Sequence, residues 1–306
     1  MQKRDLLSDF DLEKNEVLQI LDLAGDMKGS RDKYREGLKD KTLMMLFELD
    51  SLRTRVSFEA GMTQLGGHAI FYSIAGGNFT RGETLEDGVK VLDRYCDCIM
   101  ARVLNQEDIE RIGKASKVPV INAMTTMYHP CQNLADILTI KEKKRELEGL
   151  KIAYVGDAGC NTANSTMIGC SGVGMDVTMV CPDIPKFSPN KEILAKAKQH
   201  ASARIDVAHD PVQGVKDADV VYTDTWVSAG AEKEKEERLK LFKAYQVNKE
   251  LLKHTHTGSI VMHCLPAHRG YEITSDVMDG HKSVVFDEAE NRMHTEKAVV
   301  YWLLHR

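Results

Sequence analysis

Short hydrophobic runs alternate with amphipathic stretches along almost the whole chain. Runs that read as strands cover 42–47, 69–72, 97–103 and 119–124 in the first half, and 151–156, 176–181, 204–208, 220–223, 259–264 and 283–287 in the second. Strands that alternate with helices are typical of parallel sheets covered by helices on both faces. We therefore predict an α/β fold in which each half of the chain forms such a sheet.

The spacing of apolar residues places several helices between these strands. One is predicted to start after Ser51 and to stop at Gly66, because apolar residues recur between them at intervals of three and four. Another is predicted to begin near Thr84, and a last helix is predicted over 291–306. We expect this C-terminal helix to pack back on the N-terminal domain.

The length of the chain indicates two domains. A chain of 306 residues is too long for one ordinary core and suits two domains of roughly 150 residues each. The charged stretch 141–148, followed by a new buried strand, is the most plausible crossing between them. We predict one domain over 1–145, joined by the helix 290–306, and a second over 146–289.

Composition and charge exclude several classes of protein. With 42% hydrophobic and 28% charged residues and a net charge of −5, the chain has neither a nucleic-acid footprint nor a cationic membrane surface. Its seven scattered cysteines indicate reduced thiols rather than a disulfide framework. The N-terminal sequence has no signal-peptide core and the chain has no run of 18 apolar residues, so we expect a cytoplasmic protein.

Segment 50–56 is a candidate phosphate site. It follows a strand and opens a helix, so free backbone amides, the hydroxyls of Ser51 and Thr54 and the guanidinium of Arg53 converge there. An equally good interpretation is a helix cap at Ser51 with arginines that face solvent. Spacing alone does not separate the two.

Further candidates stand at other predicted strand ends, where open α/β sheets bind ligands. His129 and Gln132 follow the strand 119–124, and Arg102 closes an apolar strand, where an unpaired guanidinium would be costly. A buried anion would satisfy Arg102, and so would an acidic side chain. Taken alone, His129 is more often a structural histidine than a ligand.

We expect neither a cofactor nor a metal. Segment 156–161 follows a strand, as a dinucleotide fingerprint would, but it lacks the Gly-x-Gly-x-x-Gly pattern. His263, Cys264 and His268 do not form a recognised zinc spacing. Cys264 could also be read as a nucleophile, but His263 precedes it in the predicted strand and is expected to point to the opposite face.

Several segments resemble signatures of the aspartate/ornithine carbamoyltransferase family. Ser-Leu-Arg-Thr-Arg at 51–55 resembles the family's Ser-Thr-Arg-Thr-Arg motif, and His-Pro-Cys-Gln at 129–132 resembles its second carbamoyl phosphate motif. His-Cys-Leu-Pro at 263–266 resembles a signature of the ornithine branch. Together with segments 224–230 and 290–292, the resemblance spans nearly the whole chain. It implies transfer of a carbamoyl group from carbamoyl phosphate to the δ-amine of ornithine, giving citrulline and phosphate in arginine metabolism.

The resemblance also implies roles for particular residues. Carbamoyl phosphate would be bound by Ser51, Leu52, Arg53, Thr54, Asn78, Arg102, His129, Gln132, Cys264, Leu265 and Arg292. Ornithine would be bound by Asn161, Asp224, Ser228 and Ala229. Of these residues, Arg53, Arg102, His129, Cys264 and Arg292 would be catalytic, with Cys264 a contact near ornithine rather than an attacking group. From the residues alone, Arg292 could instead pair with Glu288 or Glu290, and Asp224 could cap a helix.

The chain departs from the family pattern at three positions. Leu52 stands in place of a threonine, Ala229 in place of a methionine that packs over ornithine, and Asn78 in place of a glutamine that reaches carbamoyl phosphate from a neighbouring subunit. These departures leave open an N-acylated ornithine or putrescine as the acceptor. A non-catalytic binding protein on the same fold is a further alternative.

The family resemblance also implies an assembly and a chemical route. The expected assembly is a homotrimer whose subunits share active sites, with 73–83 as the segment that reaches the neighbour. The expected reaction is a direct transfer that needs no metal, cofactor or covalent nucleophile. Arginines would stabilise the charge that develops on the carbonyl and phosphate oxygens.

Overall fold

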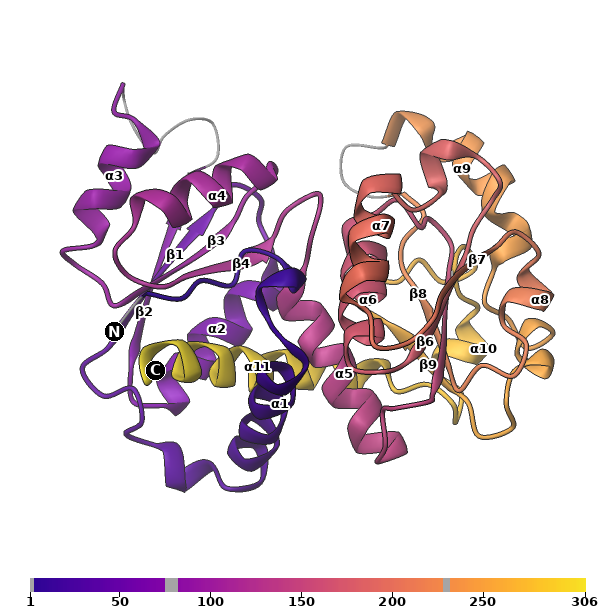
Figure 1. Ribbon diagram of the computed structural model, residues 1–306, viewed down its shortest axis with the longest axis horizontal. Helices are drawn as coiled ribbons and strands as arrows, with labels where there is room; N and C mark the ends of the chain where they lie inside the picture. The colour runs from indigo at the N-terminus through magenta and orange to yellow at the C-terminus, as the bar shows by residue number, and fades with distance from the viewer. Residues whose placement is uncertain (1–2, 75–81, 228–231) are drawn as a thin grey trace. The chain divides into compact units, whose positions relative to one another are not determined.

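The computed structural model describes residues 3–74, 82–227 and 232–306 and divides the chain into two compact units. The first unit comprises Met1–Leu138 and Glu290–Arg306, and the second comprises Thr139–Ala289. Figure 1 shows each unit as a central sheet with helices packed around it. Each unit is described by itself below.

The sheet of the first unit has four parallel strands in the order β2-β1-β3-β4. The strands are β1 (Thr42–Phe47), β2 (His68–Ser73), β3 (Cys98–Arg102) and β4 (Val120–Met124). β1, β3 and β4 are almost entirely buried, whereas β2 at the sheet edge alternates between exposed and half-buried residues. Because β1, β3 and β4 are parallel neighbours, the loops that follow them leave from one edge of the sheet.

The helices of the first unit start and stop where local chemistry requires. They are α1 (Lys14–Gly29), α2 (Leu52–Gln64), α3 (Leu85–Leu92), α4 (Gln106–Ala115) and most of α5 (Pro130–Lys144), with short 3-10 turns at Asp9–Asp11 and Arg31–Tyr34. Ser51 and Thr84 cap α2 and α3 by accepting a backbone N–H three residues on. Gly66 ends the α2 segment with a φ of 79°, where a side chain would meet the carbonyl oxygen of Arg35 at 2.5 Å.

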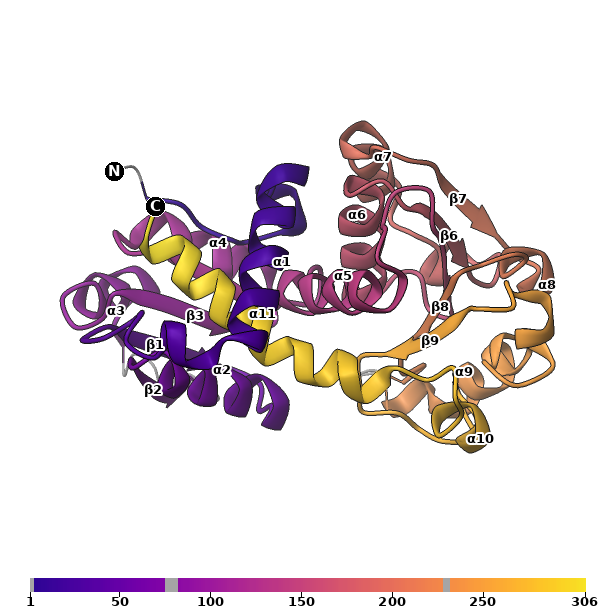
Figure 2. The same cartoon turned by 90° about the horizontal axis from the view of Figure 1, so that it is seen from below.

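The last helix, α11 (Val285–Leu304), belongs to the first unit from Glu290 onward. In both Figure 1 and Figure 2 it lies beside α1, and Lys28 on α1 donates to the side-chain oxygen of Asn291 at 2.8 Å. Lys297 donates to Gln64 at the end of α2 at 3.0 Å. The C-terminal helix therefore packs on the N-terminal part of the chain, as expected.

The sheet of the second unit has five parallel strands in the order β7-β6-β5-β8-β9. They are β5 (Lys151–Val155), β6 (Asp176–Val180), β7 (Ile205–Ala208), β8 (Val220–Thr223) and β9 (Ile260–His263). The helices are α6 (Asn161–Gly172), α7 (Lys191–His200), α8 (Pro211–Gly214), α9 (Lys235–Leu241) and α10 (Ser275–Met278), with 3-10 turns at Pro185–Phe187, Glu232–Glu234, Phe242–Tyr245 and Leu251–His254. The α/β architecture of two parallel sheets is confirmed.

The prediction of a strand over 283–287 is wrong. Ser283 makes an isolated bridge with Val261, and α11 begins two residues later at Val285. A short apolar run does not distinguish a strand from a buried helix. Here Asp287 and Glu288 fall in the first helical turn, where carboxylates stabilise the free N–H groups. The last helix consequently starts before residue 291, where the sequence placed it.

The predicted domain boundary and the division seen in the structure fall close together. The sequence placed the crossing after residue 145, just beyond α5, whereas the structural units divide within α5, between Leu138 and Thr139. On the C-terminal side, both divisions fall between residues 289 and 290. Among the described helices, none combines the length and apolar character needed to cross a membrane.

Candidate active site

The candidate residues fall into two groups, one in each unit. In the first unit they stand at or after the ends of the neighbouring strands β1, β3 and β4, and in the second they follow the neighbouring strands β5, β8 and β9. Both groups therefore stand at the carboxyl edge of a parallel sheet, where ligands bind in open α/β folds. Arg292 is the exception, because it comes from the middle of α11.

The start of α2 contains the first candidates. Ser51 is half-buried, and its hydroxyl accepts the backbone N–H of Thr54 at 3.4 Å while donating to the Thr54 hydroxyl at 3.1 Å. Thr54 is buried, whereas Leu52 is 77% exposed. The helix cap proposed as the alternative role for Ser51 is thus present. A cap of this kind still leaves other amides of the first turn available to an anion.

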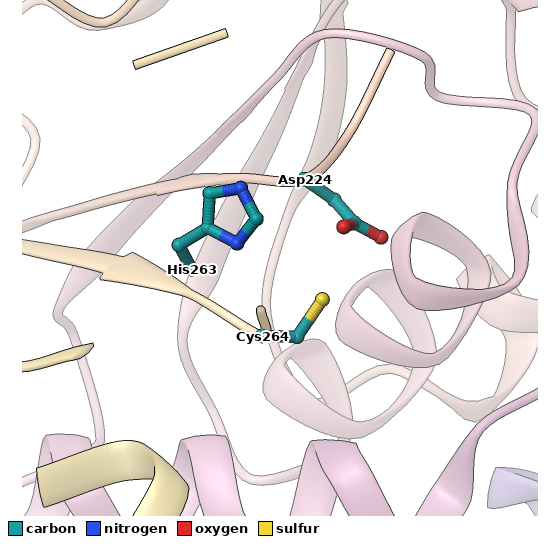
Figure 3. A group of neighbouring side chains, drawn as sticks. All are labelled: Asp224, His263 and Cys264. Carbon is teal, nitrogen blue, oxygen red and sulfur yellow. The ribbon is translucent and has the colours of Figure 1, made fainter. Parts of the chain in front are cut away.

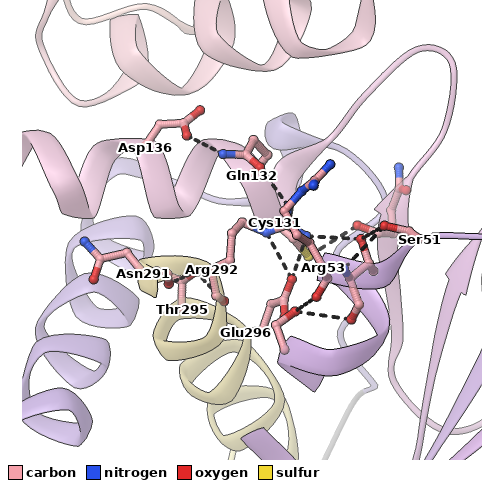
Figure 4. A network of polar contacts seen from close by, with 12 residues as sticks. Ser51, Arg53, Cys131, Gln132, Asp136, Asn291, Arg292, Thr295 and Glu296 are labelled. Atoms are coloured by element: carbon pink, nitrogen blue, oxygen red, sulfur yellow. Dashed lines mark hydrogen bonds and ion pairs between the residues drawn. The ribbon is translucent and has the colours of Figure 1, made fainter. Parts of the chain in front are cut away.

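Arg292 connects α11 to this region through a buried polar network, drawn in Figure 4. Its Nη1 donates to the Gln132 side-chain oxygen at 2.7 Å, and its Nη2 lies 3.4 Å from the Thr54 hydroxyl. Its Nε and Nη2 donate to one oxygen of Glu296 at 3.1 and 2.7 Å. The partner on α11 is therefore Glu296, and not the Glu288 or Glu290 that the sequence suggested. Gln132 in turn donates to Asp136 at 2.7 Å.

The electrostatics of this group favour an anion. Burial and the positive charges of Arg292, Arg102 and Arg53 hold the pKa of His129 well below its usual value, so the imidazole is neutral at pH 7. Burial raises the pKa of the Glu296 carboxyl, and the charge of Arg292 opposes that rise. The positive charges of three guanidinium groups thus disfavour protonation of one buried histidine. A phosphate dianion would be stabilised in such surroundings.

Arg53 and Arg55 have different surroundings although they share a motif. Arg55 is exposed; it pairs with Glu59 at 2.9 Å and lies 3.9 Å from the centre of the Phe71 ring. Arg53 is half-buried, and its charge acts on His129. The offset of two positions on α2 turns the two side chains in different directions, as expected.

In the second unit the structure brings together Asp224, His263 and Cys264. One potential ligand atom from each lies within 4.8 Å of the others, as Figure 3 shows. Asp224 follows β8, and its carboxylate accepts the backbone N–H of Thr225 at 2.7 Å. Asn161 is the first residue of α6, after β5, and its side-chain oxygen accepts the N–H of Thr162 at 2.8 Å. Leu265 follows Cys264 with a φ of 61°.

The expectation that His263 and Cys264 point to opposite faces is wrong. β9 ends at His263, so the alternation of side chains along a strand no longer applies at Cys264. His263 is fully buried; its Nδ1 accepts the backbone N–H of Leu265 at 2.9 Å, and its Nε2 lies 3.1 Å from Glu272. Both ring nitrogens thus have partners within the protein. A metal bound through Nδ1 would have to displace the Leu265 bond.

A buried arginine links the segments of the second unit that carry Asn161 and Asp224. Arg238 on α9 donates to Asp157 at 2.8 Å and to the carbonyl oxygen of Trp226 at 2.9 Å. It also pairs with Glu234 at 2.9 Å. Asp157 follows β5 and Trp226 follows β8. Arg238 therefore ties together the segments that carry Asn161 and Asp224.

Some candidates cannot be placed, and some important residues were not predicted. Asn78, Ser228 and Ala229 lie outside the described residues. The sequence interpretation missed Glu296, although a spacing of four residues from Arg292 on a predicted helix indicates a shared face. It also missed Arg238, because nothing in the sequence relates this residue to Asp157.

Each half of the chain matches a domain of one known family. Residues 4–142 match the carbamoyl-P binding domain of aspartate/ornithine carbamoyltransferase, and residues 148–303 match the Asp/Orn binding domain of the same family. An ornithine carbamoyltransferase of Pyrococcus abyssi is 47% identical, over 99% of this chain and 96% of its own length. One from Methanosarcina acetivorans is also 47% identical, over 99% of both chains.

Solved structures show the same similarity. The ornithine carbamoyltransferase of Pyrococcus furiosus superposes with a TM-score of 0.92 at 46% identity, covering 98% of this chain and 96% of that one. The ornithine transcarbamoylase of Giardia lamblia also gives a TM-score of 0.92, at 38% identity, over 100% of this chain and 99% of that one.

Proposed function

The chain belongs to the aspartate/ornithine carbamoyltransferase family, and from this premise we propose that it transfers the carbamoyl group of carbamoyl phosphate to the δ-amine of L-ornithine. The products are L-citrulline and phosphate. Relatives similar over their full lengths are named ornithine carbamoyltransferases, and one from Pyrococcus furiosus, 47% identical, is named anabolic. The proposed role is accordingly in arginine biosynthesis.

The observation that carries this proposal is the buried network around Arg292 in the first unit. Arg292 contacts Gln132 and Thr54, and its charge acts on His129 together with those of Arg53 and Arg102. In the proposed site the α2 start, with Ser51, Leu52, Arg53 and Thr54, binds the phosphate, and Arg102, His129, Gln132 and Arg292 bind the carbamoyl end. Fixed positive groups of this kind match a doubly charged phosphate.

The chemistry needs few steps. The uncharged δ-amine attacks the carbamoyl carbon, a C–N bond forms, and the C–O bond to phosphate breaks. The amine nitrogen loses a proton, which the departing phosphate takes up. Arg53, Arg102 and Arg292 stabilise the charge that develops on the carbonyl and phosphate oxygens. Because His129 is neutral, we assign it a hydrogen bond to the carbonyl oxygen rather than a permanent positive charge. Orientation of the two bound substrates supplies much of the remaining acceleration.

The second unit supplies the acceptor side of the proposal. Asp224 pairs with the α-ammonium of ornithine, and Asn161 contacts its amino-acid end. Ser228 and Ala229 belong to the same proposed group but lie outside the described residues. Cys264 and Leu265 contact the reacting ends of the substrates. A carboxylate is the natural partner for an ammonium group.

The proposal is tested by measuring citrulline release with a panel of acceptors. Purified protein is given carbamoyl phosphate with ornithine, acetylornithine, putrescine or aspartate in parallel. We expect ornithine to give the highest kcat/KM. A higher kcat/KM for acetylornithine or putrescine would retain the carbamoyl transfer and overturn the choice of acceptor. Tight binding of carbamoyl phosphate without turnover of any acceptor would identify a binding protein.

We also propose that the chain forms a homotrimer. Leu52 and Val56 stand one helical turn apart on α2 and are 77% and 50% exposed. Large apolar side chains left exposed side by side on a helix commonly mark a surface that another chain covers. β2 also leads into the segment that contains Asn78, which we propose reaches a neighbour's site. The cytoplasmic location stays a prediction from the sequence.

Two measurements test the assembly. Sedimentation should give three times the mass of the chain, and a stable monomer with full activity would contradict the proposal. If sites are shared, mixing inactive Arg53→Ala and Asn78→Ala subunits should restore some activity through hybrid sites. No restoration between stable, exchanging subunits would count against sharing.

A further inference from the structure

A buried carboxylate stands one helical turn beyond Arg292. Glu296 is 1% exposed, and residues four apart on a helix share one face. A buried carboxylate is costly unless it is paired and hydrogen-bonded. Here its partner is Arg292, which is itself only 4% exposed. The pair therefore ties one of the proposed catalytic arginines to its own helix.

The pattern of contacts shows which edge of the guanidinium Glu296 occupies. Nε and Nη2 both donate to the same oxygen, Glu296 Oε1, at 3.1 and 2.7 Å. This is the edge nearest the arginine's own aliphatic chain. Nη1, at the other end, donates to the oxygen of Gln132 at 2.7 Å, and Gln132 is held in turn by Asp136 at 2.7 Å. Two opposed contacts thus fix the plane of the guanidinium.

We propose that Glu296 is a positioning residue for Arg292, holding the Nε–Nη2 edge so that Nη1 is presented beside Gln132. This inference rests on the proposed function, in which Gln132 and Arg292 bind the carbamoyl end of carbamoyl phosphate. Arginine has several rotatable bonds, and a guanidinium held only by Gln132 and by the longer 3.4 Å contact with Thr54 would adopt more orientations. A catalytic donor must be fixed before the transition state forms, because a donor that has to reorganise stabilises charge less well.

The Glu296 carboxylate also contributes a negative charge, and this contribution can be tested separately from its role in positioning Arg292. Its negative charge offsets part of the positive field that a phosphate dianion meets. Because both bonds from Arg292 go to one oxygen, the amide oxygen of a glutamine could replace it without the charge. Glu296→Gln should therefore retain most of kcat and lower the KM for carbamoyl phosphate. Glu296→Leu should lose the orientation and lower kcat.

The test is a double-mutant cycle on citrulline formation. Glu296→Leu should lower kcat on the order of 10- to 100-fold, as the misplacement of one catalytic group commonly does. In an Arg292→Gln background the same substitution should change kcat by less than about threefold, since nothing is left to position. Thermal unfolding of all four proteins shows whether each variant is folded.

The outcomes are distinct. Equal losses from Glu296→Leu in both backgrounds, or a wild-type kcat in the single variant, would overturn the positioning role. A Glu296→Gln variant as poor as Glu296→Leu would show that charge and not orientation matters, which also overturns it. If the wild type forms no citrulline, the proposed function fails. The cycle is then measured as carbamoyl phosphate affinity by calorimetry. Glu296→Leu should bind more weakly than the equally uncharged Glu296→Gln, and only when Arg292 is present.

Discussion

Replacing Arg238 by methionine should destabilise the second unit through loss of a buried ion pair. The guanidinium lies 2.8 Å from the carboxylate of Asp157, and the two side chains are only 9% and 10% exposed. Removing one partner from such a pair leaves a buried charge and commonly costs about 3 to 5 kcal/mol. The carbonyl oxygen of Trp226 would lose its donor too, while Asp157 would keep the backbone N–H of Gly159 at 3.0 Å.

The destabilisation caused by Arg238→Met should depend on pH. Burial raises the pKa of Asp157 above its usual value, and Arg238 opposes the rise. In Arg238→Met the pKa should rise further, so the native state should bind a proton more readily than the unfolded state. The free energy of unfolding of the variant should then fall as pH increases. The loss relative to the wild type should be larger at pH 8 than at pH 5.

The chain contains a convenient probe for this measurement. It has two tryptophans, and Trp226 is buried against Phe242 with ring centres 5.7 Å apart. In a Trp302→Phe background, urea unfolding followed by fluorescence reports on the second unit. Arg238→Met with Asp157→Asn should recover much of the loss, because the unpaired charge is gone.

A matched surface pair serves as the control. Arg204 pairs with Asp176 at 2.7 Å in the same unit, but its side chain is 70% exposed. Arg204→Met should therefore have a much smaller effect, since solvent and salt screen exposed pairs. If Arg238→Met lowers the free energy of unfolding by less than about 1 kcal/mol, the value typical of exposed pairs, the reasoning from burial is refuted.

Three further predictions concern the candidate site. Arg53→Ala should lower kcat by on the order of a hundredfold, because a fixed charge-stabilising donor is lost. Arg55→Ala should have only a mild effect on kcat. Near-normal turnover of a folded Arg53→Ala variant would remove Arg53 from the catalytic set. Asp224→Asn should weaken ornithine binding by about 2 kcal/mol, measured by calorimetry, with carbamoyl phosphate binding unchanged. A loss of carbamoyl phosphate binding instead would argue against the ammonium role. The pKa of His129 is held low in the native state. Below about pH 6.5 its imidazole therefore takes up a proton in the unfolded chain but not in the native state, so the free energy of unfolding decreases as pH falls. Urea unfolding at pH 7.5 and 5.5 should show this loss in the wild type and a smaller one in His129→Gln; equal losses would contradict a buried neutral imidazole.

The sequence alone determined the architecture and most of the candidate residues. Hydrophobic runs separated by helical spacing suffice to predict parallel strands, because burial on both faces of a sheet leaves a direct record in the sequence. Ser51 could be recognised as a helix cap and Gly66 as a stop for similarly local reasons. Motif resemblance then indicated the family, which comparison with known proteins confirmed.

The tertiary structure decided the contacts between residues that are distant along the chain. Arg292 contacts Thr54 and Gln132, and Arg238 contacts Asp157, across separations that no local pattern records. The start of α11 also depended on context, because the apolar run before Asp287 suits a strand and a helix equally well. Local preferences are encoded residue by residue, whereas the partner of a buried charge is set by which elements the fold brings together.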